Sequence, residues 1–142
     1  MRRRVAPILT AVACALALAG CQKSAPSTNG VGGGRAETAD EAVGALNSFT
    51  DEMLSKVEQA GDAKAGLAEA QALLDARKNE LAARVTALRQ DAGAKRRLLE
   101  AEVENTDRVG RLRLKYADAV AQDAELKTRL ERLIGDYDAI FR

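Results

Sequence analysis

An all-α fold is the structure that this 142-residue sequence predicts most directly. No proline occurs after Pro26, and from about residue 38 the chain consists mainly of strong helix formers such as Ala, Leu, Glu, Arg and Lys. Strand signals are missing from the same region, which has few aromatic residues, little two-residue alternation and no Asn-Gly or Asp-Gly turn. Apolar residues recur there every seven positions, as coiled-coil packing requires. We therefore expect helix from about residue 38 to residue 140, with interruptions.

The expected boundaries of the helices follow from capping and stop signals. Thr38 followed by Glu41 fits a capping box, in which a hydroxyl and a carboxylate bind free N–H groups of the first turn. Gly61-Asp62 fits a helix stop followed by an N-cap residue, and Asp91-Ala92-Gly93-Ala94 is a second candidate break. The remaining glycines of this region have stronger helical surroundings, and we expect helices to tolerate them: Gly44, Gly66, Gly110 and Gly135.

Two heptad series predict how the helices pack. The first series comprises Leu46, Met53, Ala60, Leu67, Leu74, Leu81 and Leu88. The second comprises Leu98, Leu112, Ala119, Leu126, Leu133 and Ile140, with the polar Asn105 in its gap. A turn near Gly93 would bring the two series together in a long antiparallel coiled-coil-like helical hairpin, with Leu74 facing Leu112. Two alternatives remain open: a three-helix bundle with an extra break near Gly61, and a single long helix in an oligomer.

The first twenty residues differ in kind from the rest. Arg2–Arg4 form a positive region, Val5–Leu18 is uncharged and almost wholly apolar, and two small residues follow. This layout is typical of a secretory signal peptide. The apolar run is short for a membrane span, which needs about 20 residues. The sequence Leu18-Ala19-Gly20-Cys21 then resembles the lipobox of bacterial lipoproteins; the resemblance covers residues 1–22, and no family is recognised for the rest.

The lipoprotein resemblance implies cleavage between Gly20 and Cys21 and covalent lipid on Cys21. A diacylglycerol would be attached to the sulfur, and an N-acyl lipid such as palmitate to the new amino terminus. Two or more chains anchor a protein firmly, whereas one chain holds it only marginally. Gln22 stands where Asp would favour inner-membrane retention, so the resemblance implies outer-membrane delivery in a Gram-negative host. We therefore expect a lipid-anchored protein of the cell envelope that faces the periplasm.

These signals divide the chain into three parts. Residues 1–20 are expected to be the signal peptide, residues 21–37 a lipidated cysteine with a flexible Gly/Ser-rich linker, and residues 38–142 an α-helical coiled-coil domain. Loss of Arg2–Arg4 leaves 19 basic against 21 acidic residues, a net charge of −2. Such a balanced surface gives no bias toward nucleic acid. Cys14 would be lost and Cys21 lipidated, so no disulfide is expected.

The residues that carry most enzymatic chemistry are missing beyond residue 20. This part of the sequence has no His and no Trp, and Cys21 is its one cysteine. Histidine general-base catalysis, Ser-His-Asp and Cys-His arrangements and the usual zinc sites are therefore excluded. Gly32–Gly34 has neither a preceding strand nor a P-loop Lys-Ser/Thr. We expect a protein that is not an enzyme, with no catalytic residue, metal, cofactor or small-molecule substrate.

Two groups of side chains are candidate partner contacts. The first is a basic group that could meet lipid headgroups or an acidic partner: Lys95, Arg96, Arg97, Arg108, Arg111 and Arg113. The alternative interpretation is a solvated helix face that nearby Glu100, Glu104 and Asp107 neutralise. The second group is Phe49, Tyr137 and Phe141, which would gather at the linker end of the hairpin. They would form either the end of the core or a docking site.

The function expected from these observations is narrow. A lipid anchor, a helical body and no catalytic equipment favour a spacer, adaptor or scaffold that acts through protein–protein contact. The expected partner is another envelope protein or a second copy of the chain, besides the membrane itself. The alternative is a small inhibitory or immunity-type envelope lipoprotein that blocks an incoming factor.

Overall fold

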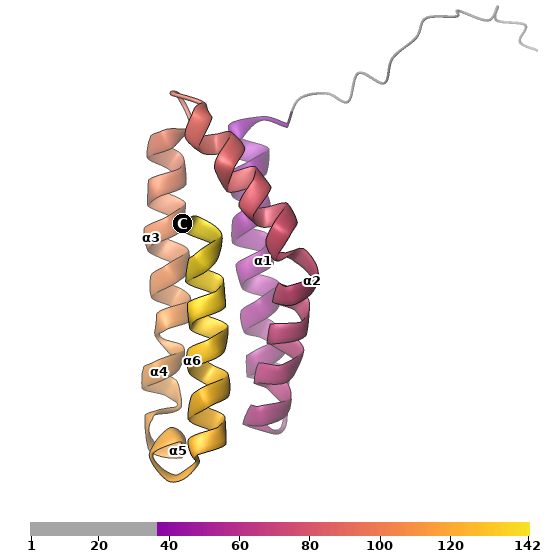
Figure 1. Cartoon of the computed structure of the whole chain (residues 1–142), viewed down its shortest axis with the longest axis vertical. Coiled ribbons are helices and arrows are strands. Elements are labelled where there is room, and N and C mark those ends of the chain that lie inside the picture. The colour runs from indigo at the N-terminus through magenta and orange to yellow at the C-terminus, as the bar shows by residue number, and fades with distance from the viewer. Residues whose placement is uncertain (1–36) are drawn as a thin grey trace, which may run out of the picture. The chain divides into compact units, whose positions relative to one another are not determined.

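In the computed structural model, which describes residues 37–142, the chain is helical and reverses direction at three places (Figure 1). The all-α prediction is confirmed, and no strand occurs in the described part of the chain. Two of the reversals lie where the sequence predicted breaks, at residues 60–62 and 91–94. The third lies at Asp123 and was not expected. The single long hairpin is therefore replaced by two hairpins packed against each other.

The first hairpin consists of α1 (Ala39–Gln59) and α2 (Ala63–Gln90). The capping box before α1 is confirmed: the Thr38 hydroxyl accepts from the Glu41 N–H at 3.2 Å, and the Glu41 carboxylate accepts from the Thr38 N–H at 2.8 Å. The Asp62 carboxylate accepts from the Ala65 N–H at 2.9 Å and begins α2. Local hydrogen bonds of this kind satisfy donors that a helix end leaves free.

Gly66 has a role that the sequence did not reveal. We expected it to be merely tolerated in a helix, but a Cβ at this position would lie 2.8 Å from Ala60 Cβ and 3.1 Å from the Val57 backbone. The backbones of α1 and α2 approach so closely here that a side chain has no room. By contrast, a Cβ at Gly44, Gly110 or Gly135 would meet nothing within 4 Å.

The second hairpin consists of four α-helices and a final short turn. Its first arm is a series of three helices, with breaks at Arg111 and Tyr116: α3 (Lys95–Gly110), α4 (Leu112–Lys115) and α5 (Ala117–Gln122). Its second arm, which runs antiparallel to the first, is α6 (Ala124–Asp138) followed by the 3₁₀ helix η1 (Ala139–Phe141). Asp123 makes the reversal, because its carboxylate accepts from the N–H groups of Glu125 and Leu126 at 3.0 Å each.

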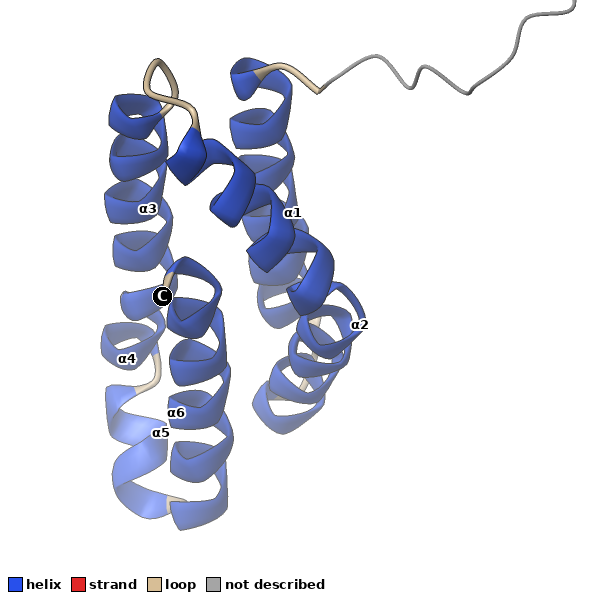
Figure 2. Cartoon of the chain, turned by 45° about the horizontal axis from the view of Figure 1, so that its top comes forward, coloured by secondary structure: helices blue, strands red, loops and turns tan. Residues whose placement is uncertain are grey.

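The two hairpins pack side by side, with α1 against α3 and α2 against α6 (Figures 1 and 2). Helices within a hairpin run antiparallel, whereas α1 and α3 run parallel. Ion pairs show this direction, since Asp40 near the start of α1 meets Arg97 near the start of α3, and Asp51 further on meets Arg108. Residues 37–142 thus form a bundle of four helical segments: α1, α2, the series α3 to α5, and α6.

The heptad series identified the core correctly. All of its apolar members are buried except two, and the polar Asn105 is buried as well. The two exceptions are Ala60, at the first reversal, and Ala119, in α5. Periodicity tells which face of a helix is buried, but not which helix covers it. No helix among residues 37–142 is long and apolar enough to span a membrane.

Candidate functional site

The candidate basic group does not form an unpaired surface. Its cations from Arg96 to Arg113 each have a carboxylate partner within the described residues, some on the same helix and some on a neighbour. Arg96 pairs with Glu100 at 2.9 Å, Arg111 with Asp107 at 2.7 Å, and Arg113 with Glu131 of α6 at 2.7 Å. Lys95 makes no ion pair with any of residues 37–142. The pairs with Glu100 and Asp107 agree with the alternative interpretation, a solvated helix face that nearby acids neutralise, and within the first turn of α3 Lys95 is the cation without an ion pair among the described residues.

A ladder of polar contacts joins α1 to α3 and α4. Its three ion pairs are Asp40–Arg97, Asp51–Arg108 and Glu58–Lys115, the last at 3.9 Å. Each pair joins residues 57 positions apart, so both helices place their charges at the same intervals. Between the first two pairs, the amide of Asn105 donates to the Asn47 side-chain oxygen at 2.7 Å. The acidic α1 thus neutralises the inner edge of the basic helix.

The three aromatic candidates are core residues. Of the two interpretations offered for them, the structure supports the core and not a docking site. Phe49, Tyr137 and Phe141 are all buried. The rings of Tyr137 and Phe141 lie 5.7 Å apart and are tilted by 57°, and the Arg77 guanidinium lies 5.4 Å from the centre of the Phe49 ring. Such packing is the ordinary use of aromatic side chains in a core. A partner could reach them only if the bundle opened.

A buried hydroxyl pair joins the two hairpins inside the core. The hydroxyls of Thr50 on α1 and Tyr137 on α6 lie 2.5 Å apart, and Thr50 also donates to the Leu46 carbonyl at 2.9 Å. Burial raises the pKa of Tyr137 to about 12. The phenol is therefore neutral at physiological pH, and its buried oxygen is satisfied, as a polar group in a core must be. This pair bridges α1 and α6 across the core.

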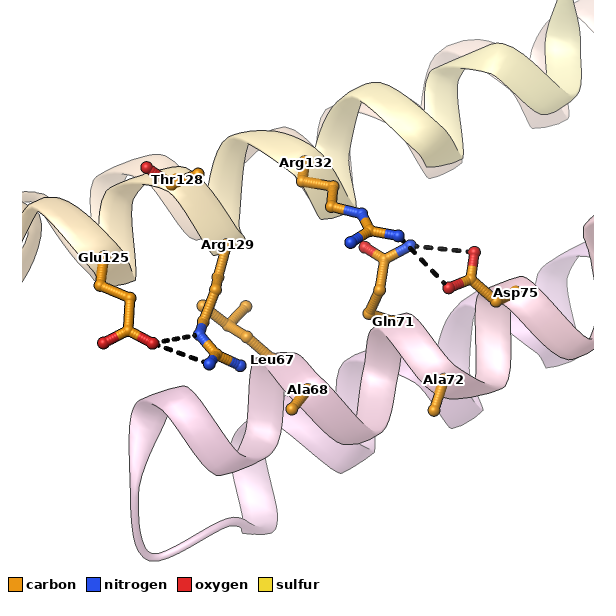
Figure 3. Close-up of a pocket in the computed structure, with 9 residues that line it drawn as sticks. All are labelled: Leu67, Ala68, Gln71, Ala72, Asp75, Glu125, Thr128, Arg129 and Arg132. Carbon is orange, nitrogen blue, oxygen red and sulfur yellow. Dashed lines mark hydrogen bonds and ion pairs between the residues drawn. The ribbon is translucent and has the colours of Figure 1, made fainter.

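A groove with a volume of about 490 Å³ lies between α2 and α6 (Figure 3). It is lined by Leu67, Ala68, Gln71, Ala72, Asp75, Glu125, Thr128, Arg129 and Arg132. The Gln71 amide donates to Asp136 at 2.8 Å and to Asp75 at 3.3 Å. Its side-chain oxygen is buried and has no hydrogen-bond partner among the described residues. The apolar part of the lining is Leu67, Ala68 and Ala72 of α2, and the other lining residues are polar or charged.

The charges on the rim of this groove are paired. Figure 3 shows Arg129 beside Glu125, with hydrogen bonds of 2.7 and 3.1 Å, and Arg132 beside Asp75. Hydrogen bonds from Arg129 and Lys64 lower the pKa of Glu125, and one from Lys78 lowers the pKa of Asp75. Both carboxylates stay ionised at neutral pH and act as hydrogen-bond acceptors. Such lowered pKa values suit surface ion pairing better than proton donation.

Sequence reasoning missed this groove for an identifiable reason. Its two walls meet only because the chain reverses at Asp123, and that reversal was not expected. No spacing in the sequence relates Gln71 to Arg132, which lie on different hairpins. An N-cap aspartate at position 123, followed by Glu125 in the first turn, is the one signal that could have indicated the extra helix.

The remaining predicted site residues, Gly20 and Cys21, lie outside the described residues. Among residues 37–142, no group of three or more potential ligands could hold a metal ion. Comparisons with protein-family models, curated protein sequences and solved structures found no match for this chain.

Proposed function

We propose that the chain is a lipid-anchored protein of the cell envelope that acts without catalysis, as a helical spacer, adaptor or scaffold. The observation that carries the proposal is the sequence Leu18-Ala19-Gly20-Cys21, directly after the uncharged run Val5–Leu18. Gln22 after the cysteine favours an outer-membrane location that faces the periplasm. Cleavage before Cys21 and lipid on its sulfur would fix the helical domain to a membrane.

The surface of the helical domain supports contact with another protein. The α2–α6 groove has paired charges along it, and α2 contributes the small, exposed side chains Ala68 and Ala72 to its lining. Small side chains allow a partner's backbone to approach, and exposed ion pairs exchange readily with charges from outside. We propose an envelope protein or a second copy of the chain as the partner.

Lipidation is tested by labelling cells with an alkyne analogue of palmitate. The full-length protein should incorporate the label and should fractionate with membranes. Cys21→Ser should abolish both, because it removes the acceptor sulfur. Cys14→Ser is the matched control, since it removes the other cysteine of the chain and should leave labelling unchanged. Equal labelling of the Cys21→Ser variant and the parent protein would reject the proposal.

Adaptor and spacer roles are separated by photo-cross-linking from single sites in living cells. A cross-linking amino acid at Ala72, in the α2–α6 groove, should capture one defined envelope protein or a second copy. The same amino acid at the exposed Ala83, on α2 but outside that groove, is the control. A product at Ala72 but not at Ala83 favours an adaptor, whereas no product from either site favours a spacer.

A further inference from the structure

The first turn of α3 differs in charge from the first turns of α1 and α6, although α2 likewise has no acidic residue in its first turn. The first turn of α3 carries Lys95, Arg96 and Arg97 and no acidic residue, and Ala94 before it provides no side-chain cap. A helix N-terminus carries a partial positive charge, so cations there are unfavourable and carboxylates favourable. Both α1 and α6 follow that rule, with acidic residues in the first turn and a side-chain cap. Departures from local rules are expected where a sequence serves a binding function.

Two of these cations are available to an outside partner. Arg97 is paired with Asp40 of α1. The Arg96 side chain is 89% exposed, and its partner Glu100 lies one turn away on the same solvated face. Exposed pairs of this kind contribute little and exchange readily. Lys95 is exposed and makes no ion pair with any described residue.

Exposed apolar side chains adjoin these cations. Leu99 is 59% exposed and Val103 is 61% exposed, and their spacing of four places them on one face of α3. Beside them, a groove of about 370 Å³ is lined by Arg89, Lys95, Leu98, Leu99 and Glu102. Among residues 37–142 the large apolar side chains that are well exposed all belong to α3 and α4. Cations beside exposed leucine and valine are typical of surfaces that lie at a lipid interface.

The position of this turn indicates which lipid surface it would meet. Arg97 contacts Asp40, and Arg84 contacts Glu37, so the first turn of α3 lies at the same end of the bundle as residue 37. Sixteen positions separate residue 37 from Cys21, and a chain of that length spans at most about 55 Å. A lipid anchor at Cys21 would therefore keep this end within about 55 Å of the headgroups, and it is the end of the bundle to which the anchored segment connects.

We propose that the first turn of α3 contacts anionic lipid headgroups of the membrane that holds Cys21, through Lys95 and Arg96 with Leu99 beside them. The inference rests on the proposed lipid anchor. Three acidic residues lie near the turn: Glu100 pairs with Arg96, Asp91 accepts a hydrogen bond from the Gly93 N–H at 2.8 Å, and Glu102 lines the groove beside Lys95. The contact would orient the bundle, with α5 and the reversal at Asp123 directed away from the lipid.

The test uses the full-length lipidated protein in vesicles of phosphatidylcholine, with or without phosphatidylglycerol. Lipid occupies the sulfur of Cys21, so Ala92→Cys or Ala121→Cys supplies a single thiol for a fluorophore, at the α2–α3 loop or in α5. A quencher attached to lipid headgroups reports proximity. Quenching at position 92 should exceed quenching at position 121, and only in vesicles that contain phosphatidylglycerol.

Charge reversal gives the decisive comparison. Each basic side chain near an anionic surface favours contact by about fivefold, so Lys95→Glu with Arg96→Glu should weaken the contact at least about 25-fold. Lys127→Glu with Arg129→Glu makes the same change in charge near the start of α6 and should leave quenching unchanged. The first variant should fold, because acids suit a helix N-terminus, and circular dichroism checks this.

The outcomes separate this inference from the proposed function. Mass spectrometry of the N-terminal peptide reports whether Cys21 carries lipid. A lipidated protein whose position 92 is quenched equally in neutral and anionic vesicles, or equally after charge reversal at Lys95 and Arg96, overturns the inference alone. Absence of lipid on Cys21 overturns the proposed function, and the inference falls with it.

Discussion

The two hairpins are built from similar residues but held together differently. In the first, α1 and α2 are uninterrupted helices of 21 and 28 residues, and their backbones meet at Gly66. In the second, the arm made of α3, α4 and α5 breaks at Arg111 and Tyr116, and α5 has no buried residue. Burial of leucine stabilises a helix pair far more than exposed ion pairs do. Both hairpins bury leucines in one core, so we expect the difference to lie in α5, which buries no side chain and should open first.

The largest effect should come from a leucine of the first hairpin. Leu74→Ala removes a fully buried side chain and should lower the free energy of unfolding by about 2–5 kcal/mol. Leu114→Ala is the matched control in the second hairpin, because its side chain is 79% exposed, and it should change stability by less than about 0.5 kcal/mol. Urea unfolding followed by circular dichroism measures both. Comparable losses for the two variants would contradict the burial of Leu74 or the exposure of Leu114.

The buried hydroxyl pair should make the contact between the hairpins sensitive to alkaline pH. The pKa of Tyr137 is raised to about 12 in the folded state, against about 10 in an unfolded chain. Its contribution is therefore fully present below about pH 10 and is lost as the pH rises toward about 12, by roughly 2–3 kcal/mol. Urea unfolding at about pH 9 and about pH 11.5 tests this. Tyr137→Phe should lose less stability over that interval, and an equal loss would show that the phenol is not responsible.

The close approach of α1 and α2 can be tested with a pair of glycines. Gly66→Ala should destabilise the protein by about 1–3 kcal/mol, because the new methyl group would collide with Ala60 and the Val57 backbone. Gly135→Ala, in the last turn of α6 with open space around it, should stabilise by up to about 0.5–1 kcal/mol. Thermal melts of the two variants should shift in opposite directions. A stabilising Gly66→Ala would mean that the first hairpin is not packed so closely.

The ion-pair ladder should have the smallest effect. Arg97→Ala removes the contact with Asp40, but both side chains are more than half exposed, so the loss should be less than about 1 kcal/mol. Concentrated salt should reduce the difference from the parent protein further, because it screens exposed charges. Unfolding in low and high salt measures this. A large, salt-independent loss would place Arg97 among the core contacts.

Local signals and periodicity predicted much of the fold. The capping box at Thr38, the turn at Asp91–Ala94 and the burial of the heptad leucines were expected and are confirmed, whereas the break at Gly61-Asp62 belonged to the three-helix alternative and not to the single hairpin. Each depends on residues close together in the chain. The reversal at Asp123 was missed because no glycine or proline marks it, and a capping aspartate alone is a weak signal.

The candidate surfaces were harder to predict because tertiary partners decide them. The arginines of α3 were identified as a basic group, but the acids that neutralise them lie 57 residues away on α1, beyond any helical spacing. The clustering of Tyr137 with Phe141 was expected, whereas their complete burial depends on helices whose arrangement the heptads left open. The need for glycine at position 66 likewise arises from a contact between two helices.

The constant offset between α1 and α3 bears on how this protein can change in length during evolution. An extra residue in the loops at 60–62 or 91–94 leaves the facing positions of the two helices untouched. One extra residue between Asp40 and Asp51 would rotate everything beyond it by about 100° and would turn one charge of the ladder away from its arginine. Insertions and deletions in descendants of this sequence should therefore concentrate in the loops, and any length change inside α1 should come in whole heptads, matched by one in α3.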